Sequence, residues 1–217
     1  MESKVYCMDC LELMRSMPDK SVELVIADPP YLPENENTGT IRTTGNKQSS
    51  LVLGGAPSKE VFDEIFRVSQ HQIIWGANNF GYPFQGFVVW EKTNIPDDFT
   101  MSRCEIASLD KGLSRVSKMV RMSSAAHGGE KRIHPTQKSV ELYAWLLKKY
   151  AKKGWTIFDP FLGSQSSRIS AYRLGFNFIG CEIDEHFFNE GEKRFRKECF
   201  GETVLADGKI VTQKTLF

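Results

Sequence analysis

The sequence of 217 residues lacks the features that mark membrane, secreted and disulfide-bonded proteins. No apolar run reaches the length of about 20 residues that spans a bilayer, and residues 1–4, MESK, do not open a signal peptide. Five cysteines, an odd number, are scattered along the chain, which suits a reducing compartment. These absences predict a cytoplasmic protein that does not act at a membrane.

The sequence also lacks a cluster of metal ligands and a strong charge of one sign. Cys7 and Cys10 form a CxxC, but no second CxxC and no group of histidines follows. We therefore favour small residues at the end of a strand over a metal or redox site. The formal net charge is only +1, so contact with a polyanion would depend on local basic patches.

Short apolar runs alternate with helical patterns, which predicts one α/β domain over residues 1–217 with a mostly parallel sheet. The expected strands are 4–7, 22–27, 72–75, 86–90, 104–108, 155–158 and 177–181. The expected helices lie near 10–16, 58–69, 137–151, 165–174 and 184–198.

Two segments have no regular pattern. Residues 32–57 are rich in Gly, Asn, Thr and Ser, and residues 111–133 are basic with one acidic residue. Long irregular segments in a compact domain are usually lids, binding loops or disordered. We expect a flexible lid or target loop at 32–57, and a composition suited to phosphate contacts at 111–133.

Residues 26–35, IADPPYLPEN, end a buried apolar strand with a carboxylate, two prolines and an aromatic ring. Prolines remove backbone N–H donors and hold the chain extended. Asp28 and the carbonyl of Pro29 therefore offer acceptors, and Tyr31 after Pro30 offers a flat ring. A nucleobase with an exocyclic amino group suits this stretch. The alternative is a tight turn at the end of a strand.

Residues 155–167, WTIFDPFLGSQSS, lead from a strand through Asp159 and Gly163 into a helix. Glycine lets the backbone approach a ligand, and a helix N-terminus offers free N–H groups. Glu182 ends the next expected strand, where a carboxylate can bind the ribose hydroxyls of a nucleotide-like cofactor. We favour cofactor binding over packing alone.

The chain resembles the S-adenosylmethionine-dependent DNA adenine-N6 methyltransferases in the motifs DPPY (28–31), WEK (90–92), HPTQKSVELY (134–143), FDPFLGSQSS (158–167) and CEID (181–184). It is most similar to small single-domain enzymes of phages and prophages, in which a circular permutation places DPPY before the cofactor motif. The resemblance implies a Rossmann-like methyltransferase fold. Its seven-stranded, mostly parallel sheet would contain one antiparallel strand and carry helices on both faces.

The resemblance also implies site residues. Asp28 and the Pro29 carbonyl would accept the amino hydrogens of adenine, and Tyr31 would stack on a base flipped out of double-stranded DNA. The catalytic residues would be Asp28, Pro29, Pro30 and Tyr31. S-adenosylmethionine would be held by Asp9, Cys10, Asp28, Thr136, Gln137, Lys138, Asp159, Phe161, Leu162, Gly163, Ser164, Ser166, Glu182 and Ile183. DNA would be contacted by Lys111, Arg115, Lys118, Arg121, Lys131 and Arg132. No metal is implied, and the chain would act as a monomer or homodimer.

Several of these residues have structural roles as alternatives. Asp9 could cap the helix that follows it, Thr136 could cap the helix after HPTQK, and Lys138 could meet a carboxylate or be solvated. His134 as a general base is a weaker possibility. Three residues at strand ends could line the base pocket or belong to core and turn: Trp75, Asn78 and Trp90.

Two positions depart from the family pattern. Gln165 stands where many members have a second glycine, which puts close approach of the cofactor in doubt there. Ser139 stands where proline is common, which predicts a less rigid helix start.

Three other functions compete with adenine methylation. Methylation of cytosine N4 is the nearest, but members acting on cytosine more often have serine in place of Asp28. A catalytically silent nucleic-acid-binding module is disfavoured by the intact DPPY, and an NAD-binding oxidoreductase by the absence of full GxGxxG spacing in FLGSQSS. Because few residues remain for DNA recognition, we expect a short or relaxed target sequence.

Overall fold

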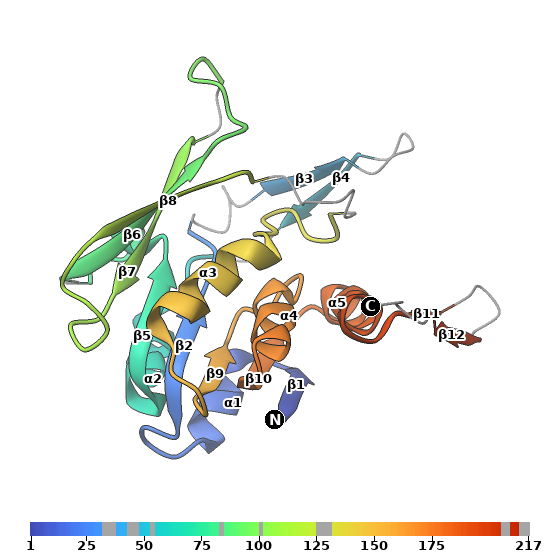
Figure 1. Ribbon diagram of the computed structural model, residues 1–217, viewed down its shortest axis with the longest axis horizontal. Coiled ribbons are helices and arrows are strands. Elements are labelled where there is room, and N and C mark those ends of the chain that lie inside the picture. Colours follow the sequence, from blue (N-terminus) through green and yellow to red (C-terminus); the bar gives the residue numbers. More distant parts are fainter. Residues whose placement is uncertain are drawn as a thin grey trace.

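The computed structural model describes residues 1–31, 38–42, 48–52, 55–82, 85–99, 102–124, 132–204 and 209–212. An eight-stranded sheet forms its centre (Figure 1). In spatial order its strands are β1 (Ser3–Cys7), β10 (Asn177–Glu182), β9 (Thr156–Asp159), β2 (Val22–Ala27), β5 (Ser69–Trp75), β7 (Cys104–Leu109), β6 (Gly86–Lys92) and β8 (Lys118–Met122).

One strand of this sheet, β7, is antiparallel to both of its neighbours, β5 and β6, and the other pairings in the sheet are parallel. The mostly parallel sheet with one antiparallel strand is confirmed, but the expected count of seven strands is wrong. The additional strand, β8, lies inside 111–133, which the sequence pattern indicated as irregular. Of its five side chains only that of Val120 is buried, so the sequence contains no apolar run there.

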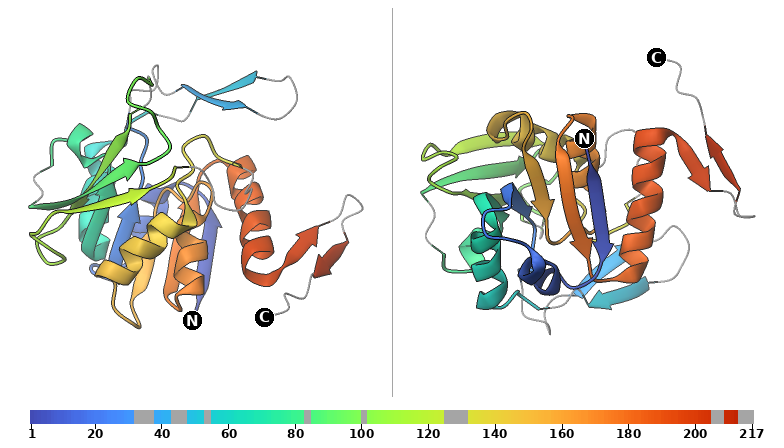
Figure 2. Two further views of the ribbon diagram at one scale, coloured as in Figure 1. Left: turned by 45° about the horizontal axis from the view of Figure 1, so that its top comes forward. Right: turned by 90° about the horizontal axis from the view of Figure 1, so that it is seen from below.

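Helices cover both faces of the sheet, as expected (Figures 1 and 2). The helices α1 (Cys10–Ser16) and α2 (Lys59–Val68) pack on one face, and α3 (Val140–Tyr150) and α4 (Ser166–Arg173) pack on the other. The fifth helix, α5 (Glu185–Phe200), contacts α4 and β10. All five lie within a few residues of the expected ranges.

The central strands are apolar on both sides because each side faces helices. In β2, Leu24 and Ile26 join the core under α3, whereas Val25 and Ala27 join the core under α1 and α2. All four side chains are fully buried. This double burial explains why β2 reads as a continuous apolar run in the sequence.

Two small hairpins were not expected. They consist of β3 (Thr38–Arg42) with β4 (Gln48–Val52), and of β11 (Glu202–Val204) with β12 (Ile210–Thr212), and both project from the body (Figure 2). The first lies within the predicted lid, 32–57. Residues 32–37, 43–47 and 53–54 of that segment lie outside the described residues, so its role as a lid stays a prediction.

All strands of the sheet except β7 bring their carboxyl ends to one edge, which we call the carboxyl edge. Asp28 follows β2 there, Gly76 follows β5, Pro160 follows β9 and Ile183 follows β10. In open α/β sheets ligands bind at this edge. Among the described residues, no helix has the length and apolar character to cross a membrane.

Candidate active site

The side chain of Asp28 is held by two donors at the carboxyl edge. The ammonium Nζ of Lys138 lies 2.5 Å from one carboxylate oxygen of Asp28 and 2.6 Å from the other. The hydroxyl of Tyr31 donates to the same carboxylate over 2.6 Å. Lys138 is buried, with 5% of its side chain exposed, so the expectation that it meets a carboxylate is correct, and the carboxylate is Asp28.

The ring of Tyr31 lies against the backbone at Gly76. A Cβ placed on Gly76 would lie 2.3 Å from a ring carbon of Tyr31, and Gly76 has φ of +64°, a left-handed conformation that favours glycine. Phe80 meets the ring of Tyr31 edge-on, with 6.3 Å between centroids. Gly76 and Phe80, which follow β5, thus fix the ring of Tyr31 at the end of the DPPY motif.

A second carboxylate, Glu105 at the start of β7, completes the surroundings of Lys138. Its Oε2 lies 3.1 Å from Nζ of Lys138, and its Oε1 lies 2.5 Å from Nζ of Lys92 at the end of β6. Lys92 also donates to the carbonyl of Ser102 over 3.1 Å. Sequence reasoning missed Glu105, although its placement opposite Trp90 in the β6–β7 register puts it next to the WEK motif.

Burial and charge set the ionisation of this cluster. Burial raises the pKa of Asp28, against the effect of Lys138. Burial also disfavours the charged form of Lys138, but Asp28 and Glu105 outweigh it and raise the pKa of the ammonium. Burial by itself would raise the pKa of Glu105, yet Lys138 and Lys92 hold that pKa below the usual value. The two ammonium groups and the two carboxylates of the cluster thus lie within ion-pairing distance of one another.

The segment before α3 corrects one expectation. Ser139 is the N-cap of α3 and accepts from the backbone N–H of Leu142 over 3.2 Å, so the helix begins at Val140 and not at residue 137. Thr136 does not cap it; its hydroxyl instead lies 3.1 Å from Nδ1 of His134. The serine found where the family often has proline therefore defines the helix start by a hydrogen bond.

The loop after β9 is fixed by two carboxylates, of which Asp159 is buried and Glu182 is half-buried. Asp159 accepts the backbone N–H of Phe161 over 3.0 Å and the hydroxyl of Ser167 over 2.5 Å, and burial raises its pKa to about 7. Glu182 accepts the backbone N–H of Gly163 over 2.7 Å and that of Asp184 over 2.9 Å. The two carboxylates brace the turn that contains Leu162 and Gly163.

The end of β1 lies beside this loop. The backbone N–H of Met8 donates to the carbonyl of Glu182 over 3.0 Å. Asp9 caps α1, accepting from the backbone N–H groups of Leu11 at 2.8 Å and Glu12 at 3.2 Å. Cys10 is buried, and Cys7 and Cys10 are free thiols.

Gln165, which stands where the family pattern has a second glycine, does not place its side chain in the turn. Gln165 has φ of +62°, a left-handed conformation that favours glycine. Its side chain points to α5, donating to Glu192 over 3.1 Å and accepting from Arg168 over 2.7 Å. Gly191 of α5 makes room for it, since a Cβ there would lie 2.6 Å from Cγ of Gln165.

The residues 134–138 connect the two halves of the site. The ring of His134 lies over Gly163, 3.6 Å from a Cβ placed there, and meets Phe187 edge-on. Burial lowers the pKa of His134 to about 4, helped by Lys138, so the imidazole is neutral at pH 7. At the other end, the hydroxyl of Ser166 donates to the carbonyl of Lys138 over 2.7 Å. The Asp28 loop and the Gly163 turn are therefore joined through one short segment.

The remaining predicted site residues have distinct placements. Gln137 is buried and accepts the backbone N–H of Ile133 over 3.0 Å. Ser164 lies against Ser166, with 3.1 Å between hydroxyls. Ile183 is 69% exposed at the carboxyl edge. Three side chains named as alternatives fall as follows: Trp75 and Trp90 are core residues, and Asn78 is exposed in the turn Ala77–Asn79.

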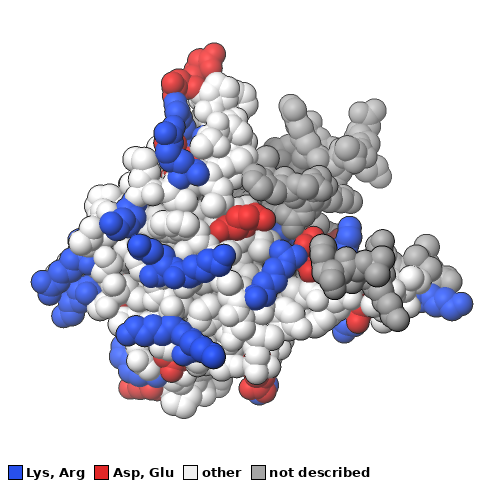
Figure 3. Space-filling model, in the orientation of Figure 1, with Lys and Arg blue, Asp and Glu red and all other residues white. Residues whose placement is uncertain are grey.

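The predicted DNA-contacting residues do not form one surface. Figure 3 shows Lys and Arg side chains over the region of β8 and α3. Lys111 and Arg115 lie in the turn between β7 and β8, at the lower left of Figure 1 and at the edge opposite Asp28. Arg121 lies near the carboxyl edge and pairs with Glu91 at 2.8 Å. The other members are Lys118 at the start of β8, Arg132 beside Ser124, and Lys131, which lies outside the described residues.

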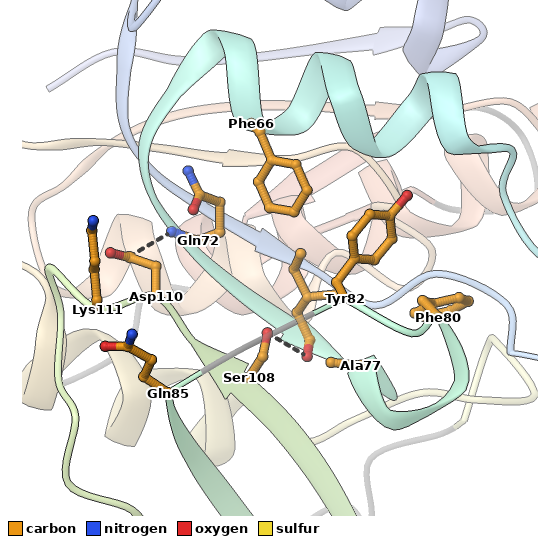
Figure 4. A pocket seen from close by; sticks show the side chains of 10 residues that line it. Phe66, Gln72, Ala77, Phe80, Tyr82, Gln85, Ser108, Asp110 and Lys111 are labelled. Carbon is orange, nitrogen blue, oxygen red and sulfur yellow. Dashed lines mark hydrogen bonds between the residues drawn. The ribbon is translucent and has the colours of Figure 1, made fainter.

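A separate cavity of about 280 Å³ lies under α2, on the face of the sheet away from α3 (Figure 4). Phe66, Phe80 and Tyr82 form its apolar side, and Gln72 and Asp110 its polar side. Neither Lys138 nor Tyr31, which bind Asp28, lines this cavity. Phe80 lines the cavity and also packs on the ring of Tyr31. Among the described residues, no group of three or more His, Cys, Asp or Glu side chains could hold a metal ion.

The sheet order and the loops at its carboxyl edge define a methyltransferase fold. The structure of M1.HpyAVI in complex with S-adenosylmethionine has a TM-score of 0.60 at 20% identity, covering 89% of this chain and 98% of its own. PvuII DNA methyltransferase (cytosine-N4-specific) has a TM-score of 0.62 at 14% identity, covering 90% of this chain and 86% of its own.

The family follows from sequence. The model of the DNA methylase family N6_N4_Mtase matches residues 67–193, and the chain belongs to this family of S-adenosylmethionine-dependent DNA methyltransferases. Type II methyltransferase M.HinfI of Haemophilus influenzae is 25% identical over 241 aligned residues, covering 87% of this chain and 67% of its own. The alternative of an NAD-binding oxidoreductase is therefore wrong. The likeness to phage enzymes stays a prediction, as does the circular permutation.

Proposed function

We propose that this DNA methyltransferase transfers a methyl group from S-adenosylmethionine to N6 of an adenine that is flipped out of duplex DNA. The observation that carries the proposal is the bridge formed by residues 134–138, which joins the acceptor carboxylate Asp28 to the Gly163 turn. Asp28 in place of serine favours adenine over cytosine N4, which is the second candidate.

The acceptor side of the site suits an amino group. An adenine amino nitrogen is a poor nucleophile because its lone pair is delocalised into the ring. With one N–H on the carboxylate of Asp28 and the other on the carbonyl of Pro29, the nitrogen would gain tetrahedral character. This stabilisation grows as positive charge develops on the nitrogen, which is the condition for catalysis. Tyr31 would stack on the flipped base.

The opposite side of the site fits the cofactor. Gly163 has φ of +48°, a left-handed conformation that favours glycine, and a Cβ placed there would lie in van der Waals contact with the ring of His134. Glu182 keeps lone pairs for ribose hydroxyls, and the exposed Ile183 offers an apolar surface to an adenine ring. When bound, S-adenosylmethionine supplies a methyl group activated by its sulfonium, so the protein's part is positioning.

The residues proposed to hold the cofactor are those of the two braced turns and the bridge. The turn after β9 supplies Asp159, Phe161, Leu162, Gly163, Ser164 and Ser166. The turn after β10 supplies Glu182 and Ile183, and the end of β1 supplies Asp9 and Cys10. The bridge supplies Thr136, Gln137 and Lys138. Because Lys138 binds both oxygens of Asp28, we assign it chiefly to the acceptor side. The chain order of the strands around β9 and β10 supports the circular permutation.

Replacement of Glu182 by alanine is expected to weaken cofactor binding by roughly ten- to a hundred-fold. A hydrogen bond to a charged group contributes about 1.5–3 kcal/mol, and each 1.4 kcal/mol is about ten-fold in affinity. Calorimetry with S-adenosylmethionine measures the dissociation constant. Glu182→Gln, which keeps one oxygen for the N–H of Gly163, serves as the matched control with a smaller loss. An unchanged constant in both variants would mean that Glu182 only braces the turn.

DNA contacts are expected on the side of the carboxyl edge. Replacing Arg121 by glutamine should weaken binding to all sequences and lower the slope of affinity against salt by about one. Lys111→Gln is the matched control, because Lys111 lies at the opposite edge of the sheet. Filter binding or anisotropy at several salt concentrations measures both variants. Equal losses would contradict this placement of the duplex. A short or relaxed target sequence remains part of the proposal.

The experiment that tests the proposed function uses labelled S-adenosylmethionine and unmethylated duplex DNA. After digestion to nucleosides, label in N6-methyladenine supports the proposal, and label in N4-methylcytosine supports the second candidate. Binding of S-adenosylmethionine, seen as thermal stabilisation, with no label in DNA would indicate a catalytically silent module.

A further inference from the structure

The cluster around Lys138 contains a carboxylate that the reaction described above does not use. Glu105 lies across Lys138 from Asp28, so that one ammonium faces two carboxylates. The distances are unequal: Nζ lies 2.5 Å and 2.6 Å from the oxygens of Asp28 but 3.1 Å from Oε2 of Glu105. Lys138 is thus bound to Asp28, with Glu105 as a nearby second acceptor.

The second acceptor has spare capacity. Oε2 of Glu105 is buried and has no well-oriented hydrogen bond within the described part of the chain. Its partner oxygen is fixed by Lys92, which is itself 7% exposed and held by the carbonyl of Ser102. A buried acceptor without a well-oriented donor is costly, so a closer contact between this oxygen and the ammonium of Lys138, which already lies 3.1 Å away, would be favourable.

The proposed chemistry creates a need for such a place. The carboxylate of Asp28 must accept a hydrogen from the amino group of the base while positive charge develops on that nitrogen. An ammonium bound to both oxygens of Asp28 occupies acceptor sites and repels the developing charge. Glu105 balances the charge of Lys138 and can draw it away from Asp28, while Lys92 limits how strongly Glu105 does so.

We propose that Glu105, tuned by Lys92, is a positioning residue that shares Lys138 with Asp28 and so frees the Asp28 carboxylate to accept the amino group of the target base. The inference deepens the proposed function and depends on it. Glu105 acts through Lys138 and does not touch the substrate.

The pH dependence of the rate separates this role from a packing role. The charged and titratable groups around Asp28 come from six parts of the chain: Tyr31 in its own loop, Lys92 on β6, Glu105 on β7, Lys138 in the segment before α3, Tyr143 on α3, and Asp159 on β9. Glu105 raises the pKa of Asp28 as a like charge. Its removal should lower that pKa, and removal of Lys92 should raise it, because Glu105 then attracts Lys138 more strongly.

The experiment compares Glu105→Gln, Glu105→Asp, Lys92→Met and the wild type in single-turnover methyl transfer between pH 5 and 8, with the enzyme saturated with S-adenosylmethionine. Glu105→Gln is expected to lower the plateau of the pH–rate profile by roughly ten- to a hundred-fold. It is also expected to move the acidic limb of that profile, where the rate falls as Asp28 is protonated, to lower pH. Lys92→Met should move the limb to higher pH, and Glu105→Asp should restore it toward the wild type. Cofactor affinity by calorimetry should stay within a few-fold in all three variants.

Glu91→Gln is the matched control. Glu91 lies on β6 beside Lys92, but its partners are Arg103 and Arg121 on the other side of the sheet, so its replacement should leave the limb in place. A direct measurement needs no cofactor. In carboxyl-detected NMR, the pKa of Asp28 should be lowest in Glu105→Gln, intermediate in the wild type and highest in Lys92→Met.

Three results would overturn the inference: a limb that does not move in Glu105→Gln, a limb that moves the same way in Lys92→Met, or an equal loss of rate in Glu105→Asp. An inactive wild type would instead contradict the proposed function, and the NMR order would still test the charge sharing. Variants that fail to fold are recognised by circular dichroism, and Glu105→Asp and the NMR titration of Lys92→Met then decide.

Discussion

Replacing Asp28 by alanine is expected to lower the rate of methyl transfer by about a hundred- to a thousand-fold or more, while cofactor affinity stays within a few-fold. Catalytic effects of this size are typical when a preorganised group that stabilises transition-state charge is removed. Asp28 is the carboxylate that would stabilise charge on the amino nitrogen, and it is not one of the groups that brace the Gly163 turn.

The loss should not be a loss of fold. In Asp28→Ala the ammonium of Lys138 keeps Glu105 as a partner at 3.1 Å, so the buried charge is not left without compensation. Single-turnover rates and calorimetry with S-adenosylmethionine measure the two effects separately. Glu91→Ala removes a carboxylate from β6 that pairs with Arg103 and lies outside the cluster around Lys138. This variant should keep a rate near that of the wild type. Full activity in Asp28→Ala would refute the mechanism.

Replacing Lys138 by methionine is expected to damage both stability and activity. The change leaves two largely buried carboxylates, with 12% of the Asp28 side chain and 21% of the Glu105 side chain exposed, and Lys92 is their one cation among the described residues. Breaking a buried pair by removing one partner costs about 3–5 kcal/mol, which for a domain of this size lowers the melting temperature by on the order of 10 °C. Activity at neutral pH should fall about a hundred-fold.

The pH dependence identifies the cause. Lys138 lowers the pKa of Asp28, so its loss raises that pKa and leaves less of the reactive carboxylate at neutral pH. Rates in Lys138→Met should therefore recover in part as the pH rises, whereas a purely structural defect would not. Lys148→Met, an exposed lysine of α3, is the matched control for thermal denaturation and rates. A melting temperature equal to that of the control would contradict the assigned ion pair.

The sequence predicted the elements that are buried on both sides and the loops that follow them. Strands such as β2 and β10 appear as apolar runs because helices cover both of their faces. The edge strand β8 was missed because Val120 is its one buried side chain. Thr136 could cap the helix after HPTQK by its residue type, as could Ser139, and only the backbone geometry selects Ser139 as the N-cap of α3.

The chemistry of single motifs was readable, but the contacts between motifs were not. Asp28 and Gly163 follow apolar strands, so their position at the carboxyl edge follows from local patterns. The pair Asp28–Lys138 joins residues 110 positions apart, and the contact of Glu105 with Lys92 depends on how β6 and β7 pair. One sequence without its fold carries no signal for such a cluster.

The most direct measurement compares the wild type with Asp28→Ala on the same unmethylated duplex DNA and labelled S-adenosylmethionine, followed by digestion to nucleosides and chromatography. We expect the wild type to place its label in N6-methyladenine and Asp28→Ala, although it binds the cofactor, to place almost none. Label confined to N4-methylcytosine, or equal labelling of N6-methyladenine by both proteins, would contradict it.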